Sequence, residues 1–125
     1  MKPQELIRQY RAGERDFILL SLSESDLSGA DLYQANLSGS DLRQADLSGA
    51  SLVGARLRRT DLRGANLQRV DLSGANLVAA DLRGANLGDA TLNHANLEKA
   101  KVDPEQLAEV ASLEGATMPD GTTYE

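Results

Sequence analysis

The sequence contains no cysteine and no tryptophan, and its only histidine is His94. The lack of cysteine excludes a disulfide framework and thiolate chemistry. One histidine without any cysteine is also too few of the usual ligands for a transition-metal site. We therefore predict that the protein is not an enzyme and that it has no catalytic residue, cofactor or metal.

Long apolar runs are missing as well. No stretch approaches the length needed to cross a membrane, and the first residues, Met1 to Glu5, lead into a polar amphipathic stretch that does not resemble a secretory signal. We expect no membrane partner and a cytoplasmic location, unless a leader has been removed.

The 125 residues are dominated by one short repeated unit. Sixteen leucines stand five residues apart from Leu22 to Leu97, an Ala usually lies two residues before each, and Asp or Asn directly precedes 12 of the 16. Gly lies two residues after seven of them. Such a period is the signature of a repeat architecture. The predicted structural core is Leu27, Leu32, Leu37, Leu42, Leu47, Leu52, Leu57, Leu62, Leu67, Leu72, Leu77, Leu82, Leu87, Leu92 and Leu97.

A five-residue period fits neither a helix nor a straight strand. On an α-helix each step of five rotates the side chain by roughly 140°, which spreads the leucines around every side. On a strand an odd step places successive leucines on opposite faces. Each unit must therefore contain its own corner, with Gly suited to a turn that needs positive φ. Four corners close a square coil of about twenty residues, with Leu and Ala inside and the residues flanking Leu outside.

The unit resembles the A(D/N)LXX consensus of the pentapeptide-repeat family, as in Ala30-Asp31-Leu32-Tyr33-Gln34 and Ala65-Asn66-Leu67-Gln68-Arg69. The resemblance covers residues 17 to about 102 and implies an all-β solenoid, a right-handed quadrilateral parallel β-helix of about four coils. The segment from Tyr10 to Phe17 is similar to the entry segment of many cyanobacterial members.

The flanking segments differ from the repeat and predict short helical caps at both ends. Pro3, with Leu6, Ile7 and Tyr10 at helical spacing, predicts the first helix. Asp103 as N-cap and Pro104 at the first helical position predict the second. The expected organisation is an N-terminal helical cap over residues 1–16, a β-helix over 17–103, and a C-terminal helical cap and tail over 104–125.

Residues twenty apart should stack in columns along the tube. Asp41, Asp61 and Asp81 form one such column, and Arg43, Arg63 and Arg83 form another on the same wall. A second basic group consists of Arg56, Arg58 and Arg59. Arg56 replaces the usual Asp or Asn before Leu57, and Arg69 extends the group. The candidate partner-binding surface is Arg43, Arg63, Arg83, Arg56, Arg58, Arg59 and Arg69. For the Asp and Arg columns we favour a solvated ladder of mutually compensating charges, and contact between the Arg-rich wall and an acidic partner is the alternative interpretation.

We expect a non-enzymatic scaffold or protein-interaction module that displays charged columns to an unidentified protein partner. The resemblance also implies an alternative, because some family members mimic duplex DNA and occupy type II topoisomerases such as gyrase. Residues 21–103 carry 11 acidic and 9 basic side chains, too balanced for a strongly negative DNA mimic. We expect no small-molecule substrate, disfavour direct nucleic-acid binding, and favour a monomer, with an end-to-end dimer as the alternative.

Overall fold

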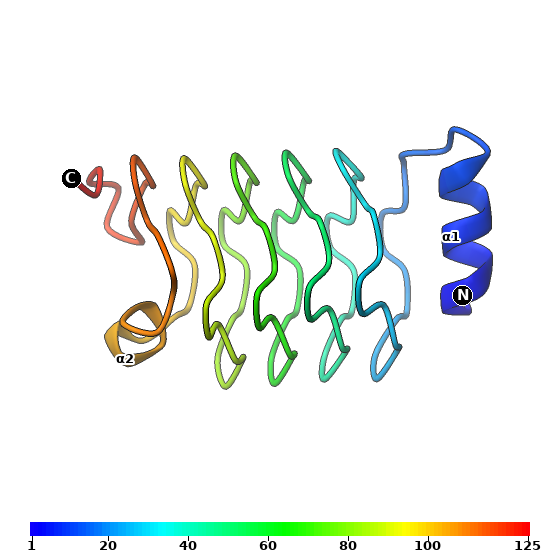
Figure 1. Cartoon of the computed structure of the whole chain (residues 1–125), viewed down its shortest axis with the longest axis horizontal. Coiled ribbons are helices and arrows are strands. Elements are labelled where there is room, and N and C mark those ends of the chain that lie inside the picture. The colour runs from blue at the N-terminus through cyan, green and yellow to red at the C-terminus, as the bar shows by residue number, and fades with distance from the viewer.

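A computed structural model describes all 125 residues. It consists of helix α1 (Pro3–Arg11), a continuous stack of coils, and a short helix α2 (Pro104–Leu107) that interrupts the stack near its C-terminal end (Figure 1). Between the helices each extended segment is so short that it appears only as isolated bridges, and all of these bridges are parallel. None of the helices is long and apolar enough to cross a membrane.

The coil repeats every twenty residues. Parallel bridges join residues twenty apart, from Asp16 with Asn36 to Asp81 with Lys101. On each wall the Leu N–H donates to the coil above, as Leu62 does to the Asp81 carbonyl at 2.8 Å. The expected square winding with four walls per turn is therefore present, and each wall is one ladder of backbone hydrogen bonds.

Corners are formed by tight turns between Leu and the next small residue. The Ala30 N–H, for example, donates to the Leu27 carbonyl at 3.1 Å. The third residue of these turns has positive φ whether or not it is glycine, with Gly29 at 67° and Arg59 at 58°. Positive φ at that turn position is the geometry of a type II turn. The prediction that the corners need this conformation is confirmed.

The polar residue before each Leu fixes the following turn. Asp26 Oδ1 accepts a hydrogen bond from the Ser28 backbone N–H at 3.0 Å, and Asn66 Oδ1 accepts one from Gln68 N–H at 3.1 Å. These local side-chain-to-backbone bonds stabilise the bend. The repeated Asp and Asn therefore serve as structural residues.

The interior is filled by aliphatic side chains. All of the predicted core leucines are buried, and most of the alanines two residues before them are buried as well. Ser40 and Thr60 take two of these small-residue positions and are also buried. The Thr60 hydroxyl donates to the Leu57 carbonyl at 2.7 Å, so its polar group has a partner inside the tube.

Helix α1 lies across the N-terminal end of the coil (Figure 1). Its Leu6 and Tyr10 are buried against the core cluster, and the Tyr10 hydroxyl donates to the Tyr33 carbonyl at 2.8 Å. The Arg15 guanidinium stacks over the Tyr10 ring, 3.7 Å from its centroid. These contacts hold the helix against the first coil.

The C-terminal segment differs from the expected helical cap and tail over residues 104–125. Helix α2 ends at Leu107, and the chain then rejoins the stack, where Ser112 pairs with Thr91 and Thr117 pairs with Asn96. Both separations are 21 rather than 20 residues, because the helix inserts one extra residue. The β-helix therefore extends beyond residue 103.

Three hydrogen bonds of the Gln106 side chain explain how α2 fits into the coil. Gln106 Nε2 donates to the carbonyls of Leu82 and Ala85 at 2.7 and 2.9 Å, and its Oε1 accepts from the N–H of Asp103, the N-cap residue. The Gln106 side chain thus replaces part of the ladder that the helix interrupts. The segment Ala111-Ser112-Leu113-Glu114-Gly115 matches the repeated unit. Sequence reasoning missed it because Leu113 does not follow the five-residue spacing of the sixteen earlier leucines.

Candidate interaction surface

One wall of the tube carries three stacked Asp–Arg pairs. We call it the Arg63 wall; it consists of residues 21–24, 41–44, 61–64 and 81–84. Asp61 and Arg63 flank the inward Leu62, so their side chains leave the backbone on the same, outer side. Arg63 Nη2 and Nε donate to the two Asp61 carboxylate oxygens at 2.7 and 2.9 Å. Arg43 and Arg83 make the same two-bond contact with Asp41 and Asp81.

The pairs also approach one another along the tube. Arg43 Nε lies 3.9 Å from Asp61 Oδ2, and Arg63 Nε lies 3.8 Å from Asp81 Oδ2. Each of these carboxylates therefore has its own arginine beside it and a second arginine from the coil below. The expected column of charges is present as a continuous ladder.

The ladder holds its carboxylates in the ionised form. The hydrogen bond from Arg43 lowers the pKa of Asp41 to about 2, with partial burial opposing the shift. The pKa values of Asp61 and Asp81 are lowered by the hydrogen bonds from Arg63 and Arg83 in the same way. The wall is thus an array of fixed ion pairs at neutral pH, as the compensating-charge interpretation anticipates.

The arginines nevertheless keep donors that face outward. Their side chains are about half exposed, at 51%, 46% and 57% for Arg43, Arg63 and Arg83. Both bonds to Asp use Nε and Nη2, and Nη1 donates to no atom of the chain. Beside these side chains lies an open, polar surface groove, which Glu24 and Gln44 also line. The arrangement can bind carboxylates or other acceptors presented along the tube axis.

The other predicted residues do not join this surface. Arg56, Arg58 and Arg59 are exposed on the adjoining wall, which we call the Arg56 wall (residues 36–39, 56–59, 76–79 and 96–99). Arg56 borders a separate polar hollow with Arg15 and Asn36. Arg69 occupies a corner at the far side of a third wall. The seven arginines are therefore one ordered column of three, a separate group of three, and the isolated Arg69.

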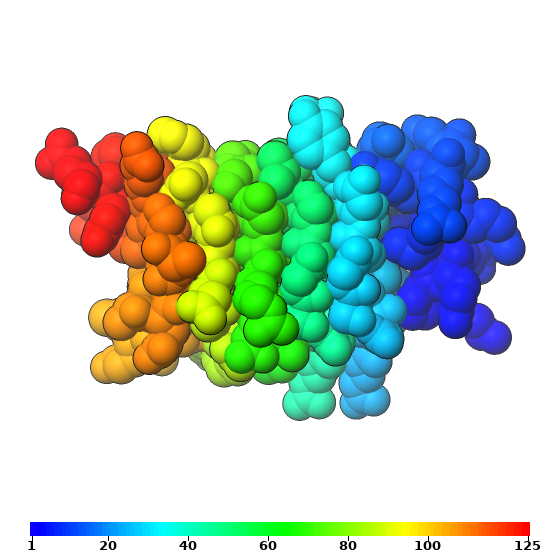
Figure 2. All heavy atoms as spheres, in the orientation of Figure 1, coloured from blue at the N-terminus to red at the C-terminus, as the bar shows by residue number.

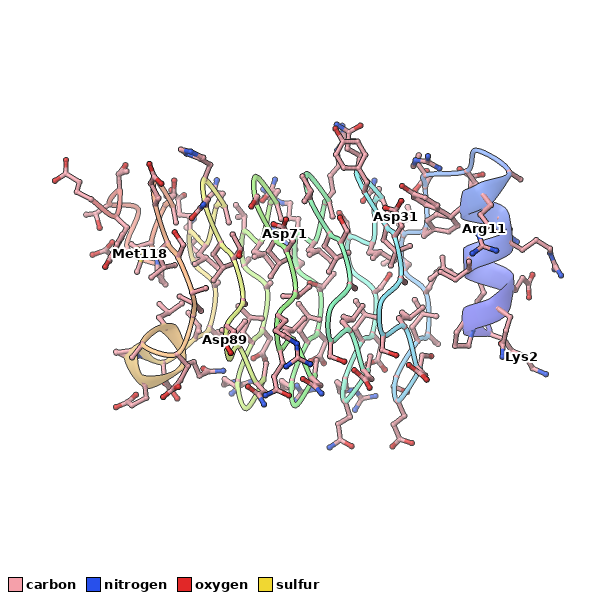
Figure 3. The ribbon with its side chains drawn as sticks, viewed as in Figure 1. Lys2, Arg11, Asp31, Asp71, Asp89 and Met118 are labelled. Atoms are coloured by element: carbon pink, nitrogen blue, oxygen red, sulfur yellow. The ribbon has the colours of Figure 1, made fainter.

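His94 occupies a corner with φ of 60°, and Asp89 occupies the preceding corner. Nowhere do three His, Cys, Asp or Glu side chains gather in a way that could hold a metal ion. Figure 3 shows Asp31 and Asp71 in the upper half of the coils and Asp89 in the lower half, nearer to α2.

Sequence reasoning placed the Asp and Arg columns on one wall and anticipated that their charges compensate, but it did not anticipate the two-bond contact within each coil. The signal was the motif Asp-Leu-Arg, which occurs at Asp41-Leu42-Arg43, Asp61-Leu62-Arg63 and Asp81-Leu82-Arg83. Two charged residues on either side of an inward Leu lie on one face, at a separation that suits a two-bond contact.

The sequence matches the family of pentapeptide repeats, in eight copies, over residues 25–64, 40–77 and 71–103. No curated protein matches it. Among solved structures, it is similar to the pentapeptide repeat protein alr5209 from Nostoc PCC 7120, with 39% identity, 87% of this chain and 93% of that chain covered, and a TM-score of 0.44.

Two further structures extend the comparison. HetL, a pentapeptide repeat protein involved in heterocyst differentiation regulation from the cyanobacterium Nostoc sp. strain PCC 7120, is 22% identical, with 99% of this chain and 100% of that chain covered and a TM-score of 0.49. A trypsin-treated variant of QnrB1, a plasmid-mediated fluoroquinolone resistance protein, is 20% identical, with 68% and 54% covered and a TM-score of 0.51. The chain belongs to the pentapeptide-repeat family, whose members form right-handed quadrilateral β-helices.

Proposed function

We propose that the protein is a non-enzymatic scaffold that binds an acidic face of another protein through the Arg63 wall. The observation that carries this proposal is the column of three half-exposed guanidinium groups, each held by two hydrogen bonds to its own aspartate. A side chain that is already fixed loses little conformational freedom when a partner binds. The wall therefore combines rigidity with outward donors.

The aspartates weaken the attraction between the wall and an acidic partner, but they make binding more selective for the positions of the partner's acceptor groups. Since each arginine charge is compensated, long-range attraction is weak, and binding depends on acceptors that meet the free Nη1 groups at the spacing of the coils. Adjacent strands in a sheet lie about 4.8 Å apart. A partner whose carboxylates follow that spacing, such as those along an acidic sheet edge, suits the wall best.

A charge-reversal experiment tests this function. Arg43, Arg63 and Arg83 are replaced by Glu, and the tagged protein is used to recover partners from native extract with crosslinking. We expect recovery to be abolished while circular dichroism and the melting temperature Tm show a folded tube. Unchanged recovery would reject the proposal.

The matched control reverses three other exposed arginines, Arg56, Arg58 and Arg69, and produces the same net charge. We expect this variant to keep the partner. If both variants lose it equally, recovery depends on overall charge rather than on the Arg63 wall, and the proposal fails.

We also propose that helix α1 acts as the cap of the N-terminal end. The first coil would otherwise leave inward leucines and unpaired edge groups open to other chains. The burial of the α1 side chains Leu6 and Tyr10 against the core of the coil supports this role.

The alternative is an inhibitor or protector of a type II topoisomerase that mimics DNA. Such mimicry needs a continuous acidic face, whereas each aspartate of the Arg63 wall is paired with an arginine. The likeness to QnrB1 concerns the fold alone. If stoichiometric amounts of this protein inhibited supercoiling by gyrase, topoisomerase inhibition would replace the scaffold as the preferred function.

A further inference from the structure

The two ends of the tube carry opposite charge. Residues 1–12 contain three basic side chains, Lys2, Arg8 and Arg11, and one acidic side chain, Glu5. Residues 104–125 contain five acidic side chains and no basic one. Figure 3 places Lys2 and Arg11 at one end and Met118 at the other. The molecule is therefore a dipole along its long axis.

The C-terminal end also has an apolar surface that the chain covers only in part. An open hollow at this end is lined by Val102, Leu107, Leu113, Met118 and Tyr124, and Tyr124 is 47% exposed. The space-filling view shows this end as an uneven surface formed by the last coil and the C-terminal residues (Figure 2). Apolar area at such a position favours contact with another macromolecule.

The backbone at this end is an open edge in part. The C-terminal tail closes one wall, where Thr123 pairs antiparallel with Thr117 and the Tyr124 N–H donates to the Ala116 carbonyl at 2.8 Å. In the inner coils the Leu N–H donates to the next coil, as Leu82 N–H does to the Lys101 carbonyl at 2.9 Å. The corresponding N–H groups of Val102 and Leu113 donate to no backbone carbonyl. These N–H groups are free to donate to acceptor side chains of another molecule.

We propose that a second copy of this chain docks on the C-terminal end in a head-to-tail manner, with its basic α1 end against the acidic C-terminal end. Contact between two C-terminal ends would bring five acidic side chains against five more. The opposite charges of the two ends instead attract each other and orient the encounter. Because each copy keeps one free end of each kind, the contact builds short linear stacks.

Sedimentation velocity at increasing protein concentration tests this proposal on the full chain. We expect the weight-average sedimentation coefficient to rise with concentration at low salt and to fall back toward the monomer value at about 0.5 M salt, where charges are screened beyond a few ångströms. A single monomeric species at every concentration in low salt would overturn the proposal.

Charge reversal at each end identifies the direction of docking. One variant replaces Lys2, Arg8 and Arg11 with Glu, and the other replaces Glu105, Glu109 and Glu114 with Lys. We expect each single-end variant to be monomeric. We expect association to return in the variant that carries both sets, because its ends are again opposite in charge.

An equimolar mixture of the two single-end variants provides a second route that does not depend on the six-fold variant folding. It should associate although neither component does so alone. Association that survives both single-end reversals, or that returns in neither the mixture nor the folded six-fold variant, would overturn head-to-tail docking.

Discussion

The buried Ser40 hydroxyl bridges two parts of the first corner. It donates to the Phe17 carbonyl at 3.2 Å and accepts from the Leu20 N–H at 3.1 Å. In the ordinary corner these two backbone groups would bond to each other. Ser40, which lies on the next coil, thus replaces the direct turn hydrogen bond at this corner. The corner follows Phe17, a bulky residue in the position that Leu occupies in later units.

Replacing Ser40 with Ala, the consensus residue, should therefore destabilise the protein. The variant leaves Leu20 N–H and Phe17 carbonyl without this partner, and we expect a loss of about 1–3 kcal/mol in the free energy of unfolding. Urea denaturation followed by circular dichroism measures it. The control is Thr60→Ala, which we expect to cost less, because the Leu57 carbonyl keeps its bond from the Thr60 N–H. Equal losses would contradict the bridging role.

Corner conformation can be tested where side chains have open space. A Cβ added at Gly74, with φ of 68°, meets nothing within 4 Å, so Gly74→Ala isolates the backbone strain. We expect a loss of about 1 kcal/mol. The reverse change Ala79→Gly, at φ of 60°, should stabilise the protein by up to about 1 kcal/mol. Thermal and urea denaturation measure both, and effects of the same sign would refute the argument.

Gly115→Ala should be more damaging than Gly74→Ala. Gly115 has φ of 70°, and an added Cβ would collide with the imidazole ring of His94 on the coil before it. The variant therefore combines backbone strain with a displaced ring. We expect a larger fall in Tm than for Gly74→Ala, and we expect the double variant with His94→Ala to recover the difference. No recovery would show that the ring is not the obstacle.

Acid should weaken the Arg63 wall. The folded-state pKa values of Asp41, Asp61 and Asp81 lie below the ordinary value of 3.8, and that of Asp41 is about 2. Their contribution to stability is therefore complete above about pH 4 and is lost as the pH falls toward 2. We expect the Tm to fall over this window.

Two variants identify the source of the acid effect. Asp→Asn at the three positions keeps an amide oxygen for the backbone N–H but removes the charge, and Arg→Gln at positions 43, 63 and 83 removes the cause of the shifts. Both should show a smaller fall in Tm between pH 4 and 2 than the unchanged protein. A fall of the original size in both would place the acid sensitivity elsewhere.

The contribution of α1 can be measured at one buried side chain. Leu6 belongs to α1 and is fully buried against the core of the coil, whereas Leu19 is 75% exposed at a corner of the first coil. We expect Leu6→Ala to cost about 2–5 kcal/mol and Leu19→Ala to change stability by less than about 0.5 kcal/mol. Urea denaturation compares them. Similar small effects would mean that the helix adds little to the coil.

The sequence was sufficient for the repeated part of the fold because one physical constraint recurs at every unit. An inward Leu every five residues requires a corner, and that requirement holds at Arg59 and His94 even though neither is glycine. The Asp and Asn bonds to the following N–H were equally predictable, since they are local.

The remaining features depend on contacts that break the period. The Gln106 side chain supports α2 through carbonyls more than twenty residues away, and the extra residue at that helix shifts Leu113 out of the five-residue count. The Asp–Arg pairing could have been anticipated from the Asp-Leu-Arg motif. The separation of Arg69 from Arg63 follows only once each unit is assigned to its wall.

Pairing between residues twenty apart has an evolutionary consequence. Loss or gain of one whole turn would leave each surviving side chain facing its former direction, so a shortened or lengthened descendant would retain the same pattern on each side. Loss of a single five-residue unit would instead rotate everything downstream by a quarter revolution and carry Arg83 away from Arg63. Viable length changes within the regular coils should therefore occur in multiples of twenty residues, whereas the coil interrupted by α2 already accommodates one extra residue.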